Sequence, residues 1–248
     1  MDLFAALELT YKAFAFAAAM AFAAGLIRGF SGFGATMTLA PSLSLVMPPT
    51  EAVAIALIME IAGASQLLPR AAREANWREF APLTVAACVL APAGSYFLVT
   101  LDPDITRRMI GATVVIFVFI MLAGYRFKGR PSLSASLSVG GLGGLLLGST
   151  GVGGPPVILY LLSTPSPAET ARANIIIHIG VTSAVLLVML WLHQVLGVVS
   201  LWRGLILFPI LITANWAGAR LFGLTSEMTF RRFALIFLAC VGLVALSL

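Results

Sequence analysis

The chain has 248 residues, of which 60% are hydrophobic and 10% are charged, against roughly 25% charged residues in an ordinary soluble domain. So few charged side chains cannot cover a water-exposed surface, and the composition excludes a soluble enzyme, a nucleic-acid-binding protein and a disordered chain. The net charge of +5 fits the basic loops on the inner side of a membrane, so the sequence predicts an all-α polytopic membrane protein embedded in the lipid bilayer.

Ten apolar segments follow one another along the chain, and one membrane span needs about 20 apolar residues. They run over residues 8–28, 33–47, 51–69, 79–100, 106–125, 132–149, 154–164, 169–192, 202–222 and 230–248. The second and the seventh are short, contain prolines and follow glycine-rich tetrapeptides. Short segments interrupted by Gly or Pro at corresponding places are typical of a transporter's binding site. We expect about eight to ten membrane segments, of which these two are broken or half helices.

The two halves of the chain carry the same features in the same order. The tetrapeptide at 31–34 (SGFG) recurs at 150–153 (TGVG), an offset of 119, and Glu51 recurs as Glu169, an offset of 118. Two later dipeptides also recur, Trp77-Arg78 as Trp202-Arg203 and Arg107-Arg108 as Arg231-Arg232. An ordered set of matches indicates an internal duplication. The predicted membrane repeats, which together form one membrane domain, are residues 1–128 and 129–248.

Basic residues predict how the helices are oriented in the membrane. The loops at 70–78 and 126–130 are rich in Arg and Lys, so both should face the cytoplasm. If all ten segments cross, eleven basic residues lie inside and four outside, whereas the count is eight against seven if the short segments turn back. Five crossings in each half make the two repeats inverted, with both termini outside.

Small residues recur in the first segment of each repeat. Gly140, Gly144 and Gly148 make two GxxxG spacings, and the first segment of the chain is rich in alanine. Such residues let another helix approach closely. We therefore expect these two helices to pack tightly, at the centre of the protein.

The two glycine loops form the first candidate site. One loop contains Ser31, Gly32, Phe33 and Gly34, and the other contains Thr150, Gly151, Val152, Gly153 and Gly154. Each stands just before a short helix, whose free N–H groups carry partial positive charge and bind anions. Either loop alone could be a tight turn between spans. As a symmetric pair, the loops predict a binding site for a small anionic substrate near the middle of the membrane.

Two ionisable residues, Glu60 and His178, lie in the middle of apolar segments at an offset of 118. A charge at the centre of a bilayer costs roughly 2.5–3.5 kcal/mol on insertion scales, so such groups usually face a cavity. We expect them to carry a coupling proton, and the alternative is a Glu–His pair that only holds the helices together. Asn174 lies one helical turn before His178 on the same face, so it joins the expected substrate-binding residues.

No group of residues in the sequence suggests a metal ion or a cofactor. The two cysteines, Cys88 and Cys240, lie in apolar runs, where a thiol packs as a small hydrophobic side chain. The sequence has no CxxC motif and no Cys/His cluster. We therefore expect no metal, no cofactor and no catalytic residue.

At the paired glycine loops the sequence resembles the TauE/SafE sulfite-exporter family of membrane permeases. The matching residues are 29–34 (GFSGFG) and 148–156 (GSTGVGGPP), while Ala35, Thr36 and Met37 stand where the family pattern has a further glycine and a nearby proline. The resemblance covers nearly the whole chain in length, duplicated layout and loop position. It implies transport of sulfite, sulfonates or related sulfur oxyanions, linked to the proton gradient, in a bacterial inner membrane.

Two other functions stay open from the sequence. One is a passive anion channel or a pure assembly subunit. The other is an intramembrane serine protease, because residues 29–32 spell GFSG and a membrane histidine, His178, could act as a base on Ser31. The matching Thr150 would then have no role. The oligomeric state is also open, a homodimer included.

Overall fold

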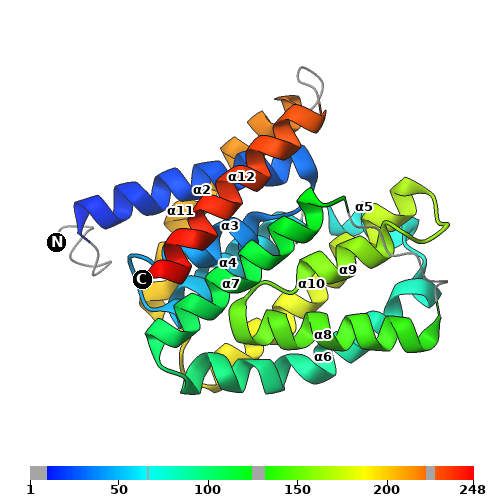
Figure 1. Cartoon of the computed structure of the whole chain (residues 1–248), viewed down its shortest axis with the longest axis horizontal. Coiled ribbons are helices and arrows are strands. Elements are labelled where there is room, and N and C mark those ends of the chain that lie inside the picture. Colours follow the sequence, from blue (N-terminus) through cyan, green and yellow to red (C-terminus); the bar gives the residue numbers. More distant parts are fainter. Residues whose placement is uncertain (1–9, 66, 125–131, 222–226) are drawn as a thin grey trace.

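The computed structural model describes residues 10–65, 67–124, 132–221 and 227–248. Over these residues the chain is entirely helical, with eleven helices and no strand. In chain order the helices drawn in Figure 1 are α2 (Tyr11–Ser31), α3 (Ala35–Leu43), α4 (Pro49–Ser65), α5 (Leu68–Glu74), α6 (Trp77–Thr100), α7 (Pro103–Leu122), α8 (Leu133–Thr150), α9 (Gly154–Leu161), α10 (Ala168–Leu192), α11 (Val198–Leu221) and α12 (Glu227–Ser247).

Each of the ten predicted apolar segments corresponds to a helix, and the ends agree within four residues. The two segments predicted to be short are α3, with nine residues, and α9, with eight. Helix α5 departs from the prediction of a plain basic loop over 70–78. Pro69 stands in its first turn, and the Arg70 Nε lies 2.7 Å from Glu74 Oε1, an i,i+4 pair that stabilises a short helix.

Within the described residues, six helices are long and apolar enough to cross a membrane, namely α2, α6, α7, α8, α10 and α11. A seventh span follows if α4 and α5 form one broken span, and the apolar part of α12 is shorter. The predicted range begins at eight, which is reached when α4 and α12 are also counted, and it ends at ten, which includes the two short helices α3 and α9. The outer helix faces expose large apolar side chains such as Phe119 and Trp216, as a surface in contact with lipid requires.

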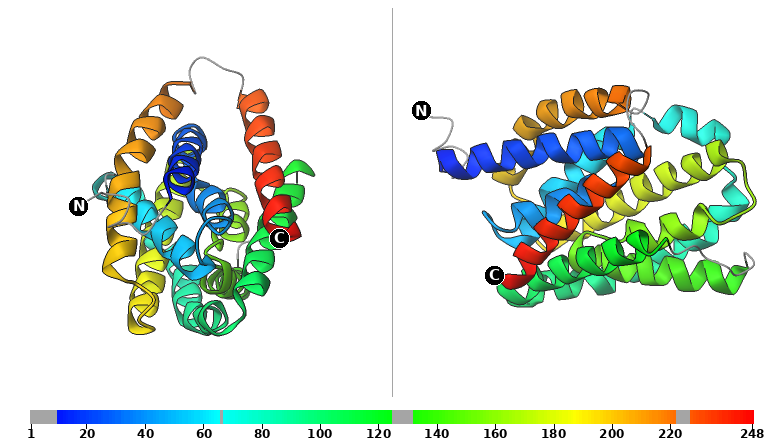
Figure 2. Two further views of the ribbon diagram at one scale, coloured as in Figure 1. Left: turned by 90° about the vertical axis from the view of Figure 1, so that its left-hand side faces the viewer. Right: turned by 45° about the horizontal axis from the view of Figure 1, so that its top comes forward.

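Helices of the first half of the chain pack mainly against helices of the second half. Helix α2 lies against α11, α6 against α8, and α7 against α12. Figure 1 shows the α2–α11 pair along one edge and the α6–α8 pair along the opposite edge, with α3, α4, α9 and α10 between them. The two further views in Figure 2 show the same pairs, and α4 contacts α10 in the interior.

Glycines allow the α6–α8 pair to approach to backbone contact. A Cβ atom built on Gly140, Gly144 or Gly148 would lie 2.1, 2.2 or 2.3 Å from a backbone oxygen of α6, which no real side chain tolerates. The close approach predicted from the GxxxG spacings is therefore confirmed. The prediction that the first helices of the two halves lie together at the centre is wrong, because α2 and α8 belong to opposite edges (Figure 1).

The ends of the described chain lie on one side of the molecule. Figure 1 shows that α2 begins and α12 ends on the left, whereas α5 lies on the right. This arrangement is compatible with both termini on one side of the membrane, and the orientation itself stays a prediction. The second basic loop used for that prediction, at 126–130, lies outside the described residues.

Candidate functional site

Both glycine loops end a long helix with a left-handed glycine. Gly32 has a φ of 81° and Gly151 a φ of 73°, values that only glycine adopts readily, and the N–H of each bonds to the carbonyl four residues earlier. A second left-handed residue, Gly34 with a φ of 99°, turns the chain into α3. These glycines therefore reverse the chain within a few residues and bring a new helix N-terminus next to the end of the previous helix.

The hydroxyl groups of the loops bond within the loops themselves. Ser31 Oγ lies 2.7 Å from the carbonyl oxygens of both Ile27 and Phe33. Thr150 Oγ1 donates to the Leu146 carbonyl at 2.7 Å and accepts from the Val152 N–H at 3.2 Å. The two hydroxyls thus shape the turns, and neither is among the residues that line the cavity described next.

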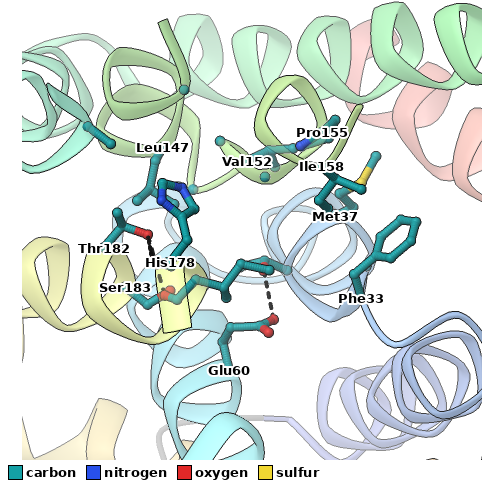
Figure 3. Close-up of a pocket in the computed structure, with 18 residues that line it drawn as sticks. Phe33, Met37, Glu60, Leu147, Val152, Pro155, Ile158, His178, Thr182 and Ser183 are labelled. Carbon is teal, nitrogen blue, oxygen red and sulfur yellow. Dashed lines mark hydrogen bonds between the residues drawn. The ribbon is translucent and has the colours of Figure 1, made fainter. Parts of the chain in front are cut away.

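The two glycine loops, although 119 residues apart, line one cavity of about 30 Å³, which exceeds the space that one ordered water needs. Of the predicted site residues, those in its wall are Phe33, Gly34, Glu60, Gly151, Val152, Gly153, Gly154 and His178. Figure 3 shows Phe33 and Met37 on the right of the cavity, Val152 and Pro155 above it, His178 on the left and Glu60 below. Ser31, Gly32, Thr150 and Asn174 are not in the wall.

Helices α3 and α9 begin at this cavity, and no side chain caps either N-terminus. The first intrahelical bond of α3 runs from the Thr38 N–H to the Gly34 carbonyl, which leaves the N–H groups of residues 35–37 without a partner inside the helix. In α9 the second and third residues are Pro155 and Pro156, which have no N–H. The first-half helix therefore offers more backbone donors than its second-half counterpart.

Glu60 is held by a buried ion pair. Its Oε1 lies 2.9 Å from Nη1 of Arg28, and its Oε2 accepts a hydrogen bond from Thr36 Oγ1 at 2.9 Å. Arg28 and Glu60 are 6% and 2% exposed, so both charges are removed from solvent. A buried carboxylate needs such a partner, because an unpaired charge in this environment is far too costly.

His178 has a different partner from a different helix. Its Nδ1 lies 2.9 Å from Thr84 Oγ1 on α6, and only 3% of the residue is exposed. Thr182 donates to the His178 carbonyl oxygen at 2.7 Å (Figure 3). The alternative of a Glu60–His178 pair that holds the helices together is therefore wrong, although both residues line the same cavity.

Asn174 is fully buried but faces the start of α6. Its Oδ1 accepts from the Asn76 N–H at 2.9 Å, and its Nδ2 donates to Glu79 Oε2 at 3.3 Å. The same carboxylate accepts from Ser166 Oγ at 2.6 Å. Asn174 therefore joins α10 to the N-terminus of α6, and the structure does not bring it to the glycine loops.

A second ion pair, which is partly buried, includes a glutamate of the same helix as Glu60. Glu51, in the first turn of α4, pairs with Arg203 of α11 and accepts from Ser200 Oγ at 3.0 Å. These three residues line a separate cavity of about 480 Å³ between the α3–α4 and α10–α11 connections. Helix α4 is thus joined by ion pairs to both members of the α2–α11 pair.

Sequence reasoning missed Arg28, Thr36 and Thr84 as part of the site. The topology prediction counts Arg28 only as one of the eleven basic residues on the inner side, and it lies 32 positions before Glu60. A signal was nevertheless present, because Arg28 stands in an apolar run one residue before the glycine motif at 29–34. An arginine at that depth requires a buried acceptor.

The arrangement required by the serine-protease alternative is not formed in the described part of the chain. Ser31 is exposed and bonds to carbonyl groups of its own loop, whereas the His178 ring bonds to Thr84. A nucleophilic serine needs its base within hydrogen-bond reach. The GFSG tetrapeptide is therefore explained by the turn that it makes.

Comparison with known proteins places the chain in one family. The family model described as Sulfite exporter TauE/SafE matches residues 17–245, a region that contains both glycine loops and the whole cavity wall. No curated protein and no solved structure gives a significant match. With six long apolar helices in the described ranges and a family match over nearly its whole length, the chain is a multi-pass membrane protein that belongs to the TauE/SafE sulfite exporter family.

Proposed function

We propose that the chain is a secondary transporter for small sulfur oxyanions such as sulfite and organosulfonates, coupled to protons, in a bacterial inner membrane. The observation that supports this most directly is that two glycine loops, one from each half, line a single cavity and each starts a short helix there. Free N–H groups and the positive end of the helix dipole favour an anion at that point. An oxyanion presents several oxygen acceptors and can use donors from both loops at once.

The apolar part of the wall supports a dehydrated site. The cavity wall contains the apolar side chains of Phe33, Met37, Val152 and Ile158. These side chains do not compete with an anion for the backbone N–H groups. Backbone donors act more strongly on an anion when water is excluded. The site therefore suits a small anion that sheds its hydration shell, rather than a large or cationic substrate.

We also propose that the two halves, 1–128 and 129–248, are inverted repeats, and that two groups of helices move against each other, each group containing helices of both halves. The pairing of α2 with α11 has its counterpart in the pairing of α8 with α6, as a two-fold exchange of halves requires. Helices α3 and α4 pack with the α2–α11 pair, and α9 and α10 pack with the α6–α8 pair. The cavity is lined by Gly34 and Glu60 from the first of these groups and by Gly153 and His178 from the second. Binding at a repeat interface is the arrangement by which alternating access opens a site to either side.

Uptake of labelled sulfite into proteoliposomes tests the proposal. A carrier exchanges labelled sulfite rapidly when the vesicles are preloaded with unlabelled sulfite, and a pH gradient drives accumulation. A passive channel shows neither behaviour, and either negative result would reject a proton-coupled carrier.

Gly154→Ala tests the site itself. A Cβ at Gly154 meets only Ile158 Cδ1 at 3.5 Å, an ordinary contact, but it occupies the cavity. We expect sulfite uptake to fall roughly tenfold, within the 1–3 kcal/mol that an inserted methyl group costs at a packed site. Gly153 is less suitable, because a Cβ there would lie 2.2 Å from the Gly143 oxygen. The matched control is Gly180→Ala, whose Cβ also makes only an ordinary contact and lies outside the wall.

A further inference from the structure

The guanidinium of Arg28 is buried, and the described part of the chain offers acceptors to only one of its nitrogens. Its Nη1 bonds to Glu60 Oε1 at 2.9 Å and lies 3.4 Å from the Glu60 backbone oxygen. Within the described residues these are its only acceptors, although a guanidinium has five N–H donors in a planar fork. Buried cations are normally paired through more of their donors than this. The remaining donors of Arg28 therefore suit a further acceptor with several oxygens.

The guanidinium of Arg28 lies directly against the backbone of α4 at Gly63. A Cβ on Gly63 would lie 2.8 Å from both Cζ and Nη1 of Arg28, so the absence of a side chain at 63 makes room for the cation. Glu60, three residues earlier on α4, lies in the cavity wall, whereas Arg28 does not. The carboxylate therefore stands between the cation and the cavity.

We propose that Arg28 is the cation that binds the transported oxyanion, and that the Glu60 carboxylate occupies its place until Glu60 takes up a proton. This inference rests on the proposed transport function and names the specificity-determining side chain of the same site. A carboxylate and a sulfonate or sulfite ion present the same kind of oxygen edge to a guanidinium, so the two compete for one position. Thr36, which holds the second Glu60 oxygen, stabilises the empty form of the site.

Charge balance fits the exchange of a carboxylate for a substrate anion. In the empty form the pair of Arg28 and Glu60 is neutral overall. When Glu60 takes one proton from bulk water it becomes a neutral acid, and a monoanion bound to Arg28 restores neutrality. One proton therefore enters with each monoanion, and the low-dielectric site never holds an unpaired charge.

The other charged groups near Glu60 do not offer a competing acceptor at the cavity. His178, from α10, is the one other titratable residue in the cavity wall as the structure describes it. Helix α3 carries no charged residue. The remaining charged residues on helices that contact α4 lie outside the wall and are Arg70, Arg73, Glu74, Arg78, Glu79, Asp104, Arg107, Arg108, Glu169, Arg172, Arg203 and Arg220.

The test uses methanesulfonate, which stays a monoanion between about pH 6 and pH 8, so that any pH dependence comes from the protein. Isothermal titration of the purified full chain should show that Glu60→Gln binds methanesulfonate about tenfold more tightly than wild type at about pH 8. The gain in affinity that wild type shows on lowering the pH should be absent in this variant. In the double variant with Glu60→Gln and Arg28→Gln, the tighter binding of methanesulfonate should be lost.

The Glu51–Arg203 pair provides a matched control. Its carboxylate also lies on α4 and pairs with an arginine of another helix, but both residues line the other cavity. Glu51→Gln should leave methanesulfonate affinity within about twofold of wild type. If Glu60→Gln gives too little folded protein, Thr36→Val serves instead. It removes the bond to Glu60 Oε2 while keeping the fold of the loop, and it should raise the affinity in the same direction by a smaller factor.

Three results would overturn the inference while leaving the proposed function intact. They are unchanged or weaker binding by Glu60→Gln and Thr36→Val, an equal effect of Glu51→Gln, and no methanesulfonate binding by a wild-type protein that transports sulfite. The proposed function fails separately if wild-type proteoliposomes show no sulfite counterflow.

Discussion

Glu60 and His178 lie in the wall of one cavity, on two helices that contact each other. The two side chains bond to residues of two further helices, a different one for each. Glu60 pairs with Arg28 of α2, and His178 bonds to Thr84 of α6. The two titratable residues are thus oriented separately, one by a cation and one by a hydroxyl group. Glu60 and His178 stand at corresponding positions of the two halves of the chain, 118 residues apart. The difference between their partners means that the two sides of the cavity are chemically unequal.

The close contact of α6 and α8 predicts a severe effect of a larger residue at Gly144. A Cβ there would lie 2.2 Å from the Ala87 carbonyl oxygen, and two helices would have to separate. We expect Gly144→Leu to destabilise the protein by more than about 2 kcal/mol, as strong overpacking does. The yield of monodisperse protein and its Tm in detergent measure this. Gly141→Ala is the control, because its Cβ meets only the flexible end of Leu90 at 2.8 Å, and a similar loss there would contradict the packing argument.

Asn174→Ala should lower the stability of the protein without changing its affinity for the substrate. The substitution leaves the Asn76 N–H without its acceptor and removes one donor from Glu79 Oε2, which costs about 1–3 kcal/mol for a buried group. We therefore expect a lower Tm and a sulfite affinity within about twofold of wild type. A large loss of affinity at unchanged Tm would return Asn174 to the substrate-binding residues.

The basic residues predict a defined result for cysteine labelling. In a background with Cys88→Ala and Cys240→Ala, a membrane-impermeant thiol reagent added outside should label Lys12→Cys and should not label Arg73→Cys. Both positions are exposed, and Figure 1 shows α2 beginning on the side opposite α5. Labelling of both after the membrane is permeabilised is the control. The opposite pattern would reverse the orientation inferred from the basic loops.

The helices and the paired loops could be predicted because their signals are local in the sequence. Apolar runs mark the helices, and left-handed positions at the loops require glycines such as Gly32 and Gly151. The partners of the site residues could not be predicted, because they depend on which helices pack together. Arg28 reaches Glu60 from α2, and Asn174 shares a helix face with His178 yet bonds to the start of α6, where no sequence spacing points.

His178→Gln should separate the transport of dianions from that of monoanions. One proton on Glu60 balances a monoanion at Arg28, so a dianion leaves one negative charge that only His178 can offset within the described cavity wall. Glutamine can keep a hydrogen bond to Thr84 but cannot take up a proton. We expect the variant to bind sulfate roughly tenfold more weakly than wild type at about pH 6, and methanesulfonate within about twofold. Thr84→Val keeps the imidazole and should keep sulfate binding measurable at that pH. Equal losses for sulfate and methanesulfonate would show that His178 serves the packing of α10 against α6 and carries no proton for transport.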